Sequence, residues 1–399
     1  MKRILFIDDD QNILDSFRAM IHLKRREWKG SYERNAEAGL KLLSEERFDV
    51  VVADIRMPGM DGAEFFEKVR DIQPRTIRVI LSGYSDMQCL FKSAKFAHQF
   101  LSKPCSSAML IDTLQRLVDL DDIMSNDAIR EIIVRLKSLP VIPEIYLSVT
   151  KELQKPEPDL KWVGKLVEKD VGLSATLLKV VNSAFFGFYE RVISPAHAVV
   201  LLGLDSLKGL ILGVKLLGSF ELPNVRDYSV DKLWQHSLQT GYFAKVIATE
   251  EGMDKEFIES CFVGGILHDV GKLVLLTQLY DVYGSVLETV RTEGGPIYDL
   301  EQHELKVSHA EIGSYLLGTW GFKDSIVRGV HCHHTPRKCG KGLTTALVVH
   351  VANAIQHELA VWTSGYVSAS MDMELLEESG LDGRLEAWRE LCREYLEAQ

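Results

Sequence analysis

Short apolar runs alternate with segments of helical periodicity over the first 122 residues of the chain. The apolar runs are Ile4–Ile7, a weaker one near Ser31–Arg34, Val50–Ile55, Ile77–Leu81 and Gln99–Leu101. The helical patterns cover about Gln11–Lys24, Ala36–Glu46, Ala63–Ile72, Met87–Phe96 and Ser106–Leu120. Strands that alternate with helices form parallel sheets with helices on both faces. The pattern therefore predicts an α/β domain with a doubly wound, five-stranded parallel sheet.

The pattern changes after Asp121 and Asp122, and almost only helical periodicity remains from Ala128 onward. Helices are expected at Leu160–Glu168, Leu173–Asn182, His197–Leu202, Ser206–Leu217, Val230–Thr249 and Glu256–Leu276. We therefore expect the first domain over 1–122 and a helical linker over 123–138. An all-α domain over 139–340 would follow, opening with the rigid, extended segment Leu139–Pro143. Helices over 341–399 would pack on that domain or extend it.

Composition narrows the function classes. The formal charge of −11 argues against broad binding of nucleic acid, which needs a basic surface. No run of 18 apolar residues and no secretory leader is apparent, so we expect no membrane span and a cytoplasmic protein. The six cysteines have no framework spacing, and we expect reduced thiols.

Polar residues stand at the ends of four predicted strands. Asp8 and Asp9 follow the first, Asp54 ends another, Ser82 follows a third and Lys103 follows the last. Because parallel strands end at the same edge of a sheet, these groups are expected to meet there. Clustered carboxylates call for a divalent cation, and Mg²⁺ suits Asp8, Asp9 and Asp54. Asp54 could then accept a phosphoryl group, whose charge Mg²⁺, Lys103 and Ser82 would neutralise.

These residues, with the run Met57–Gly62 after Asp54 and Lys103-Pro104 before the last helix, resemble a two-component receiver domain with a flavodoxin-like fold. The resemblance spans residues 1 to about 122. It implies that Phe100, three positions before Lys103, is the aromatic switch residue. The alternative is that the acids only cap helices and Lys103 forms a surface ion pair. Four such groups at four strand ends favour the site.

A second group of possible metal ligands lies in the helical region. Its members are His236, His268, Asp269, His309, His333 and His334. Helices that project imidazole and carboxylate groups inward can build a centre for iron, manganese or zinc. Each histidine alone could equally be a hydrogen-bonded packing residue. Cys332 and Cys339 lie nearby, but their spacing matches no tetrahedral zinc motif well.

This region resembles the HD phosphohydrolase superfamily, and more closely its HDOD branch. The HDOD resemblance rests on Leu139–Pro143, Asp170–Ser174, Lys179–Gly187 and Ala198–Leu204. It implies a regulatory output module. Two departures weaken a hydrolase assignment: Asn353 stands where HD hydrolases place a late aspartate ligand, and Thr335–Lys338 replaces a Gly-Tyr-Pro signature.

The sequence thus predicts a response regulator that a sensor histidine kinase phosphorylates on Asp54. Its helical domain would act mainly through an unknown protein partner, with a homodimer as one option and without direct DNA binding. The rival prediction is a phosphorylation-gated metal phosphohydrolase that acts on a nucleotide or cyclic dinucleotide.

Overall fold

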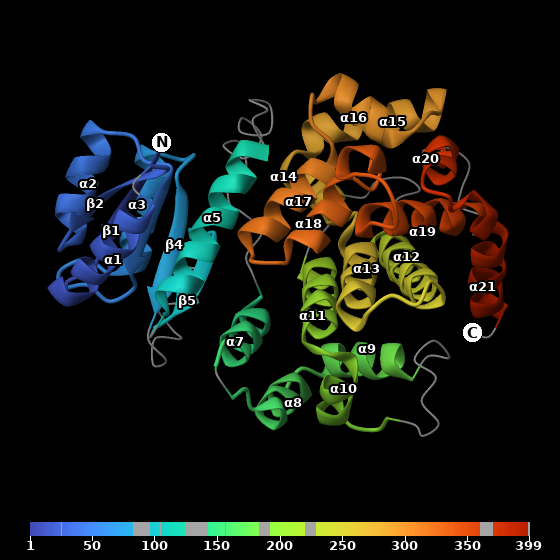
Figure 1. Cartoon of the computed structure of the whole chain (residues 1–399), viewed down its shortest axis with the longest axis horizontal. Coiled ribbons are helices and arrows are strands. Elements are labelled where there is room, and N and C mark those ends of the chain that lie inside the picture. The colour runs from blue at the N-terminus through green and yellow to red at the C-terminus, as the bar shows by residue number, and fades with distance from the viewer. Residues whose placement is uncertain are drawn as a thin grey trace. The chain divides into compact units, whose positions relative to one another are not determined.

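The computed structural model divides the chain into an α/β unit and a helical unit (Figure 1). The first covers Met1–Glu144, and the second includes Ile145–Leu317 and Phe322–Gln399. The structure describes residues 1–24, 26–82, 96–103, 105–123, 143–155, 157–182, 192–219, 229–359 and 370–397.

The α/β unit is built on a five-stranded, fully parallel sheet with the strand order β2-β1-β3-β4-β5. The strands are β1 Lys2–Ile7, β2 Trp28–Glu33, β3 Val50–Asp54, β4 Ile77–Ser82 and β5 Gln99–Ser102. The apolar parts of β1, β3 and β4 are fully or almost fully buried, as expected for strands covered on both faces. All five predicted strands are present, and the doubly wound sheet is confirmed.

The helices α1 Gln11–Leu23, α2 Ala36–Glu45, α3 Gly62–Ile72 and α5 Ser107–Ile123 flank this sheet. α1 packs against α5, whereas α2 packs against α3. The strand order reverses direction between β1 and β3, so right-handed crossovers place these pairs on opposite faces. The helix expected at Met87–Phe96 lies almost wholly outside the described residues.

The helical unit carries a long series of helices and no strand in its described residues. Before the histidine cluster they are α7 Glu144–Leu153, α8 Leu160–Glu168, α9 Val171–Val181, α10 Pro195–Leu202 and α11 Leu204–Ser219. The central helices are α12 Val230–Glu250, α13 Lys255–Leu267, α14 Val270–Gln278, α15 Tyr280–Glu293, α16 Ile297–Glu304, α17 His309–Thr319 and α18 Asp324–His331. The chain then forms the 3₁₀ helix η2 Pro336–Cys339, α19 Thr345–Leu359, α20 Met373–Glu378, the 3₁₀ helix η3 Asp382–Arg384 and α21 Leu385–Glu397. The rigid entry expected at Leu139–Pro143 lies outside the described residues except for Pro143.

One predicted helix is wrong in its extent. The apolar pattern over Glu256–Leu276 predicted a single helix, but the chain breaks between α13 and α14 at His268 and Asp269. The break lets α14 approach α17, where a Cβ atom on Gly271 would overlap the carbonyl oxygen of His309. Because both halves are buried on nearly all sides, the hydrophobic pattern carries no trace of the break.

The segment Lys255–Gln278 also has the length and apolar composition of a membrane span. In its most apolar window, 94% of the residues are buried inside the helical unit. A buried pair of core helices meets the same criteria, and this burial identifies the segment as such a pair.

The C-terminal helix α21 packs on α12 and α19. The indole N–H of Trp388 donates a hydrogen bond to Glu251 at 2.9 Å, and the rings of Tyr395 and Tyr242 lie 5.2 Å apart. Trp388 is fully buried. The last helix therefore contributes to the core of the helical unit.

Candidate functional site

The polar strand ends of the α/β unit meet at one edge of the sheet. Lys103, which follows β5, places its ammonium 2.6 Å from an oxygen of Asp8 and 2.6 Å from an oxygen of Asp54. Asp8 is fully buried, whereas the side chain of Asp54 is 13% exposed. One cation thus bridges two carboxylates that come from two neighbouring strands.

Electrostatics follow from this burial. Burial raises the pKa of Asp8, and the Lys103 ammonium only partly offsets this effect. Burial also acts to lower the pKa of Lys103, but hydrogen bonds to Asp54 and Asp8 outweigh it and raise that pKa. The ammonium therefore stays charged next to the oxygens of Asp54.

Asp8, Asp9 and Asp54 each offer a carboxylate oxygen, and these oxygens all lie within 4.8 Å of one another. Mg²⁺ takes one or two carboxylates together with waters and phosphate oxygens, so this donor set fits it. Two other acids have a different task. Asp10 caps α1 through the N–H of Asn12, and Asp61 caps α3 through the N–H of Glu64.

Ser82 ends β4, and Phe100 lies on the neighbouring strand β5. Ser82 is buried at the end of β4, and its carbonyl oxygen accepts a hydrogen bond from the N–H of Lys103 at 2.8 Å. Phe100 pairs in register with Ile80 on β4 and is half-buried. Both residues therefore lie on neighbouring strands, and their roles in phosphate binding and switching stay predictions.

The second group of predicted residues meets inside the helical unit. Gly265 of α13 faces α12 so closely that a Cβ atom on it would lie 2.6 Å from the Cα atom of Gly241. This close approach brings His268, at the end of α13, to His236 on α12. Gly271 similarly brings α14 against the start of α17, where His309 lies.

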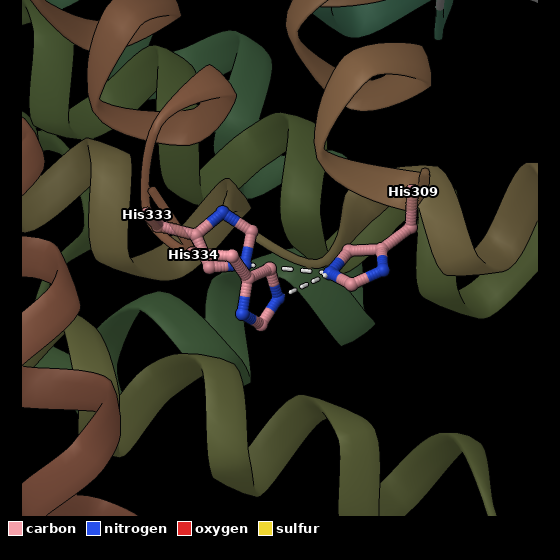
Figure 2. A group of neighbouring side chains, drawn as sticks. All are labelled: His309, His333 and His334. Carbon is pink, nitrogen blue, oxygen red and sulfur yellow. Dashed lines mark hydrogen bonds between the residues drawn. The ribbon is translucent and has the colours of Figure 1, made fainter. Parts of the chain in front are cut away.

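Three of the histidines converge on one point. The Nε2 atom of His309 lies 3.3 Å from that of His333 and 3.0 Å from that of His334. Figure 2 shows the rings of His333 and His334 turned toward the ring of His309. We call these residues the three-histidine site.

His236, His268 and Asp269 form a second group beside it. The Nε2 atoms of His236 and His268 are 3.0 Å apart. Asp269 joins the two groups, because its Oδ1 lies 3.5 Å from His268 Nε2 and 3.2 Å from His309 Nε2. Its Oδ2 accepts a hydrogen bond from Lys272 at 2.7 Å.

The outer nitrogen of most of these rings already has an acceptor. His268 Nδ1 lies 2.7 Å from the Gly265 carbonyl, and His333 Nδ1 lies 2.6 Å from the Val330 carbonyl. A carbonyl can only accept, so both Nδ1 atoms carry the proton and both Nε2 atoms present a lone pair inward. Such second contacts fix the tautomer of metal-binding histidines.

His236 and His309 follow the same rule with side-chain acceptors. Gln356 places its Oε1 2.6 Å from His236 Nδ1, and Glu301 places its Oε2 2.6 Å from His309 Nδ1. Lone pairs that face one another at about 3 Å repel unless a cation or a proton lies between them. The donor set of five imidazoles and one carboxylate therefore fits a divalent transition metal, and suits zinc or iron better than Mg²⁺.

The rings are kept neutral by burial, with one exception. Burial lowers the pKa of His236 to about 3 and that of His268 to about 4, and holds those of His333 and His334 well below the usual value. Burial also opposes a proton on His309, but the Glu301 carboxylate outweighs it and raises that pKa. Neutral imidazoles are the form that binds metal.

The sequence analysis missed three residues of this cluster. Glu301 and Gln356 hold His309 and His236 as described. His357, also on α19, packs its ring 4.8 Å from that of His236, and burial lowers its pKa to about 3. No motif marks these residues, since only the packing of α16 and α19 brings them to the cluster.

Asn353 lies one turn before His357 on α19 and is buried. Its Oδ1 has no hydrogen-bond partner within the part of the chain that the structure describes. A buried amide oxygen without a partner is costly and indicates a missing partner such as a cation or water. The neutral side chain predicted as a departure from HD hydrolases therefore sits in the core of the helical unit.

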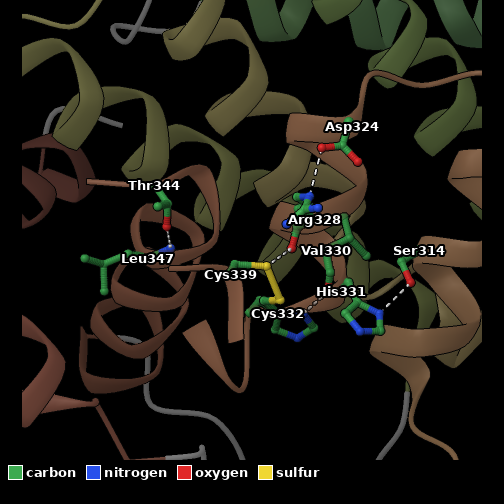
Figure 3. Close-up of a disulfide and its surroundings, with 10 residues drawn as sticks. Ser314, Asp324, Arg328, Val330, His331, Cys332, Cys339, Thr344 and Leu347 are labelled. Carbon is green, nitrogen blue, oxygen red and sulfur yellow. Dashed lines mark hydrogen bonds and ion pairs between the residues drawn. A yellow bond between two sulfur atoms is a disulfide. The ribbon is translucent and has the colours of Figure 1, made fainter. Parts of the chain in front are cut away.

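The expectation of six reduced cysteines is wrong for one pair. Cys332 and Cys339 form a disulfide across a sequence separation of seven residues (Figure 3). Their spacing gave no framework signal, because the loop that brings them together is local and irregular. Their sulfurs are bonded to each other and are not metal ligands in this structure, while Cys105, Cys261 and Cys392 are free thiols.

Comparison with known proteins identifies both units. A family model described as a response regulator receiver domain matches residues 4–115, and one described as an HDOD domain matches residues 139–336. An uncharacterized protein of Treponema pallidum is 29% identical over 200 residues, which are 50% of this chain and 38% of that protein. The chain thus spans well under half of that relative.

Two crystal structures share the fold of the helical unit. One is an HDOD domain protein of unknown function from Geobacter sulfurreducens, with a TM-score of 0.50 and 22% identity. It covers 67% of this chain and 97% of its own. The other is a putative phosphohydrolase from Shewanella amazonensis, with a TM-score of 0.51, 22% identity and coverages of 67% and 93%. These two structures show the fold alone, whereas the two family models show that the chain belongs to the response regulators, with a receiver domain that precedes an HDOD domain.

Proposed function

We propose that Asp54 is the phosphoacceptor of a two-component response regulator. The observation that carries this proposal is the position of Lys103, whose ammonium contacts both Asp54 and the fully buried Asp8. A fixed cation at this point lies where the charge of a transferring phosphoryl group develops. A sensor histidine kinase is the expected phosphodonor.

In the proposed reaction an Asp54 oxygen attacks the phosphorus of a phosphohistidine. A P–O bond forms, the P–N bond breaks, and the leaving imidazole takes up a proton. Mg²⁺ held by Asp8, Asp9 and Asp54 would neutralise charge on the phosphoryl oxygens. Lys103 would contact the same oxygens, and Ser82 would offer a hydroxyl beside them.

The HDOD domain, which the sequence places over residues 139–340, would act mainly through protein interaction. A neutral Asn353 in place of a carboxylate supports this output over catalysis, because an amide binds a divalent metal more weakly. Phosphorylation would reorganise Ser82 and Phe100 and so bias the equilibrium between two conformations. A partner that binds one conformation more tightly would report the change.

The acceptor is tested with acetyl phosphate and phosphate-affinity electrophoresis on the full chain. The wild-type protein should shift with Mg²⁺ present, and Asp54→Asn should not shift. Asp15→Asn serves as the control, because Asp15 is an exposed residue on α1 that pairs with Arg18. If the Asp54→Asn protein showed the mobility shift at the wild-type rate, the assignment of Asp54 as the acceptor would be refuted.

A second function, metal-dependent phosphohydrolysis, is favoured by the inward Nε2 atoms of four histidines, His236, His268, His309 and His333. Asp269 would bridge the two groups of ligands, with an oxygen near each. When bound, a divalent metal supplies a Lewis acid and lowers the pKa of a coordinated water that can attack a phosphoester. Lys272, buried beside Asp269, would place a positive charge near the substrate phosphate.

Metal analysis and turnover of a nucleotide panel test this second function. Gently purified protein should contain transition metal, and His268→Ala should lose both metal and turnover. His303→Ala is the control, because His303 is an exposed histidine on α16. If the protein is purified without metal and cannot be loaded with zinc, iron or manganese, the hydrolase function is excluded. Protein interaction would then remain as the proposed output.

A further inference from the structure

The disulfide closes the loop that carries two histidines of the three-histidine site. Cys332 follows the last residue of α18 and Cys339 ends η2, so His333 and His334 both lie between the bonded sulfurs. We propose that Cys332 and Cys339 form a reversible thiol–disulfide site whose oxidation state sets the affinity of the three-histidine site for a divalent metal. This inference rests on the metal centre proposed above.

His333 is held independently of the disulfide. Its Nδ1–H donates to the Val330 carbonyl at 2.6 Å, and its own carbonyl accepts a hydrogen bond from His350 Nδ1 at 2.7 Å. His350 is anchored in turn, because its Nε2 accepts from the N–H of Asp372 at 3.0 Å. Opening of the disulfide would therefore leave His333 in place.

His334 lacks such anchors. Its Nδ1 has no hydrogen-bond partner among the described residues, and its ring packs on Tyr298 with centroids 4.8 Å apart. Its Nε2 points to His309. The position of this ring therefore depends on the course of the loop, which the covalent bond between Cys332 and Cys339 fixes.

A weaker attachment holds the same loop from outside. Arg337 pairs with Asp372, Glu374 and Glu378 at 2.9 to 3.2 Å. Arg337 and Glu374 are exposed, and exposed ion pairs are weak and screened by salt. The reduced loop would thus keep its general place while the His334 ring gains freedom.

The two cysteines differ in solvent exposure, and this determines which sulfur a reductant attacks first. Cys332 is 2% exposed, whereas Cys339 is half-buried. A thiolate of a small dithiol would attack Cys339 Sγ, break the S–S bond and release Cys332 as a thiolate that takes up a proton. The second thiol of the reductant then displaces Cys339, so one disulfide and two protein thiols form with two electrons transferred. A small disulfide such as glutathione disulfide drives the reverse reaction.

The structure also accommodates the reduced form. Cys339 Sγ lies 3.7 Å from the Arg328 carbonyl oxygen, which can accept a hydrogen bond from the thiol once the disulfide is open. The local backbone needs no rearrangement for this contact. Reduction would therefore loosen the loop without unfolding α18.

The test uses the full chain in two states, one oxidised with glutathione disulfide and one reduced and freed of reductant under argon. Each is titrated with Co²⁺ and followed by its visible absorption. The oxidised protein should bind Co²⁺ about tenfold more tightly, the size expected for fixing the orientation of a ligand. The Cys332→Ser/Cys339→Ser protein should match the reduced state under both treatments. Cys105→Ser, which changes a free and partly accessible thiol, should keep the full redox response.

Several results would overturn the proposal. Equal Co²⁺ affinity in both states would remove the redox control and leave the metal centre standing. Tighter binding by the reduced protein, with a sulfur-to-cobalt charge-transfer band, would show that the thiols are ligands instead. Absence of Co²⁺ binding in both states would remove the metal centre and this inference together. Alkylation of both cysteines after treatment with glutathione disulfide would show that the bond does not form.

Discussion

Glu301 holds His309 with a single carboxylate oxygen. Its Oε2 accepts hydrogen bonds from the His309 backbone N–H at 2.8 Å and from His309 Nδ1 at 2.6 Å, while its Oε1 accepts one from the Tyr283 hydroxyl at 2.7 Å. Glu301 and His309 are both completely buried. The carboxylate thus determines which nitrogen of His309 faces the other histidines.

Glu301→Gln should weaken metal binding about 10- to 100-fold, the usual cost of losing a second contact of a metal-binding histidine. Both carboxylate oxygens of Glu301 accept hydrogen bonds, one from Tyr283 and the other from His309. In the glutamine variant, the NH₂ group replaces one of these acceptors and faces a donor, so the amide no longer orients His309 Nδ1–H. Isothermal titration with zinc measures this loss. Glu304→Gln, an exposed change on the same helix, should leave the affinity unchanged, and equal losses in both proteins would contradict the role of Glu301.

The receiver fold was predictable because each buried strand is a short apolar run bounded by polar residues. The meeting of Asp8, Asp54 and Lys103 was predictable for the same reason, since all three stand at strand ends in the sequence itself. Asp10 and Asp61 show the limit of this argument. They stand beside site residues in the sequence but turn away to cap α1 and α3.

The helical unit was less predictable because burial on all sides removes the periodicity that marks a helix face. The break at His268 and Asp269 lies inside such a segment. His357 was missed because it reaches the cluster only through the packing of α19 on α12, two helices distant in sequence. Glu301 was missed because no motif marks it, although it lies only eight residues before His309. The disulfide depends on how seven residues fold back after α18, which no spacing rule describes.

Lys103→Met should slow phosphorylation of Asp54 at least about 100-fold, because it removes a fixed cation from the phosphoryl site. It also leaves Asp8 and Asp54 without their shared cation. We therefore expect the phosphorylation rate to depend more steeply on the Mg²⁺ concentration. Without Mg²⁺, the free energy of unfolding should fall by about 1–3 kcal/mol. Rates with acetyl phosphate and urea denaturation measure both effects. Lys68→Met, on the exposed side of α3, should change neither quantity.

The receiver should lose stability in mild acid because of His98. This side chain is buried at the start of the β5 region, its Nδ1 accepts the N–H of Arg78 at 2.9 Å, and burial together with the Arg78 charge holds its pKa well below the usual value. The unfolded chain takes up a proton below about pH 6.5 while the folded receiver does not, so acid favours unfolding. Each pH unit below about 6 should cost about 1.4 kcal/mol.

Hydrogen exchange of β4 and β5 in the full chain at pH 7.5 and 5.5, corrected for intrinsic rates, measures this loss. His98→Asn keeps an acceptor for the Arg78 N–H and should flatten the dependence on pH. His22→Asn, at an exposed position on α1, should not. A His98→Asn protein with the wild-type slope would show that another group causes the acid sensitivity.

Asn353→Asp should place a carboxylate on α19 one turn before His357, whose ring packs against that of His236. Without metal, the new charge is buried without a partner cation, and we expect the free energy of unfolding to fall by about 1–3 kcal/mol. With zinc or manganese, the carboxylate gains a cation, so the variant should show a larger metal-induced rise in melting temperature than the wild-type protein. Thermal denaturation with and without metal gives both numbers, and Gln278→Glu at the end of α14 controls for an added charge. If metal stabilises Asn353→Asp no more than the wild-type protein, Asn353 does not face the metal position. The lack of a carboxylate there would then no longer support an output through protein interaction.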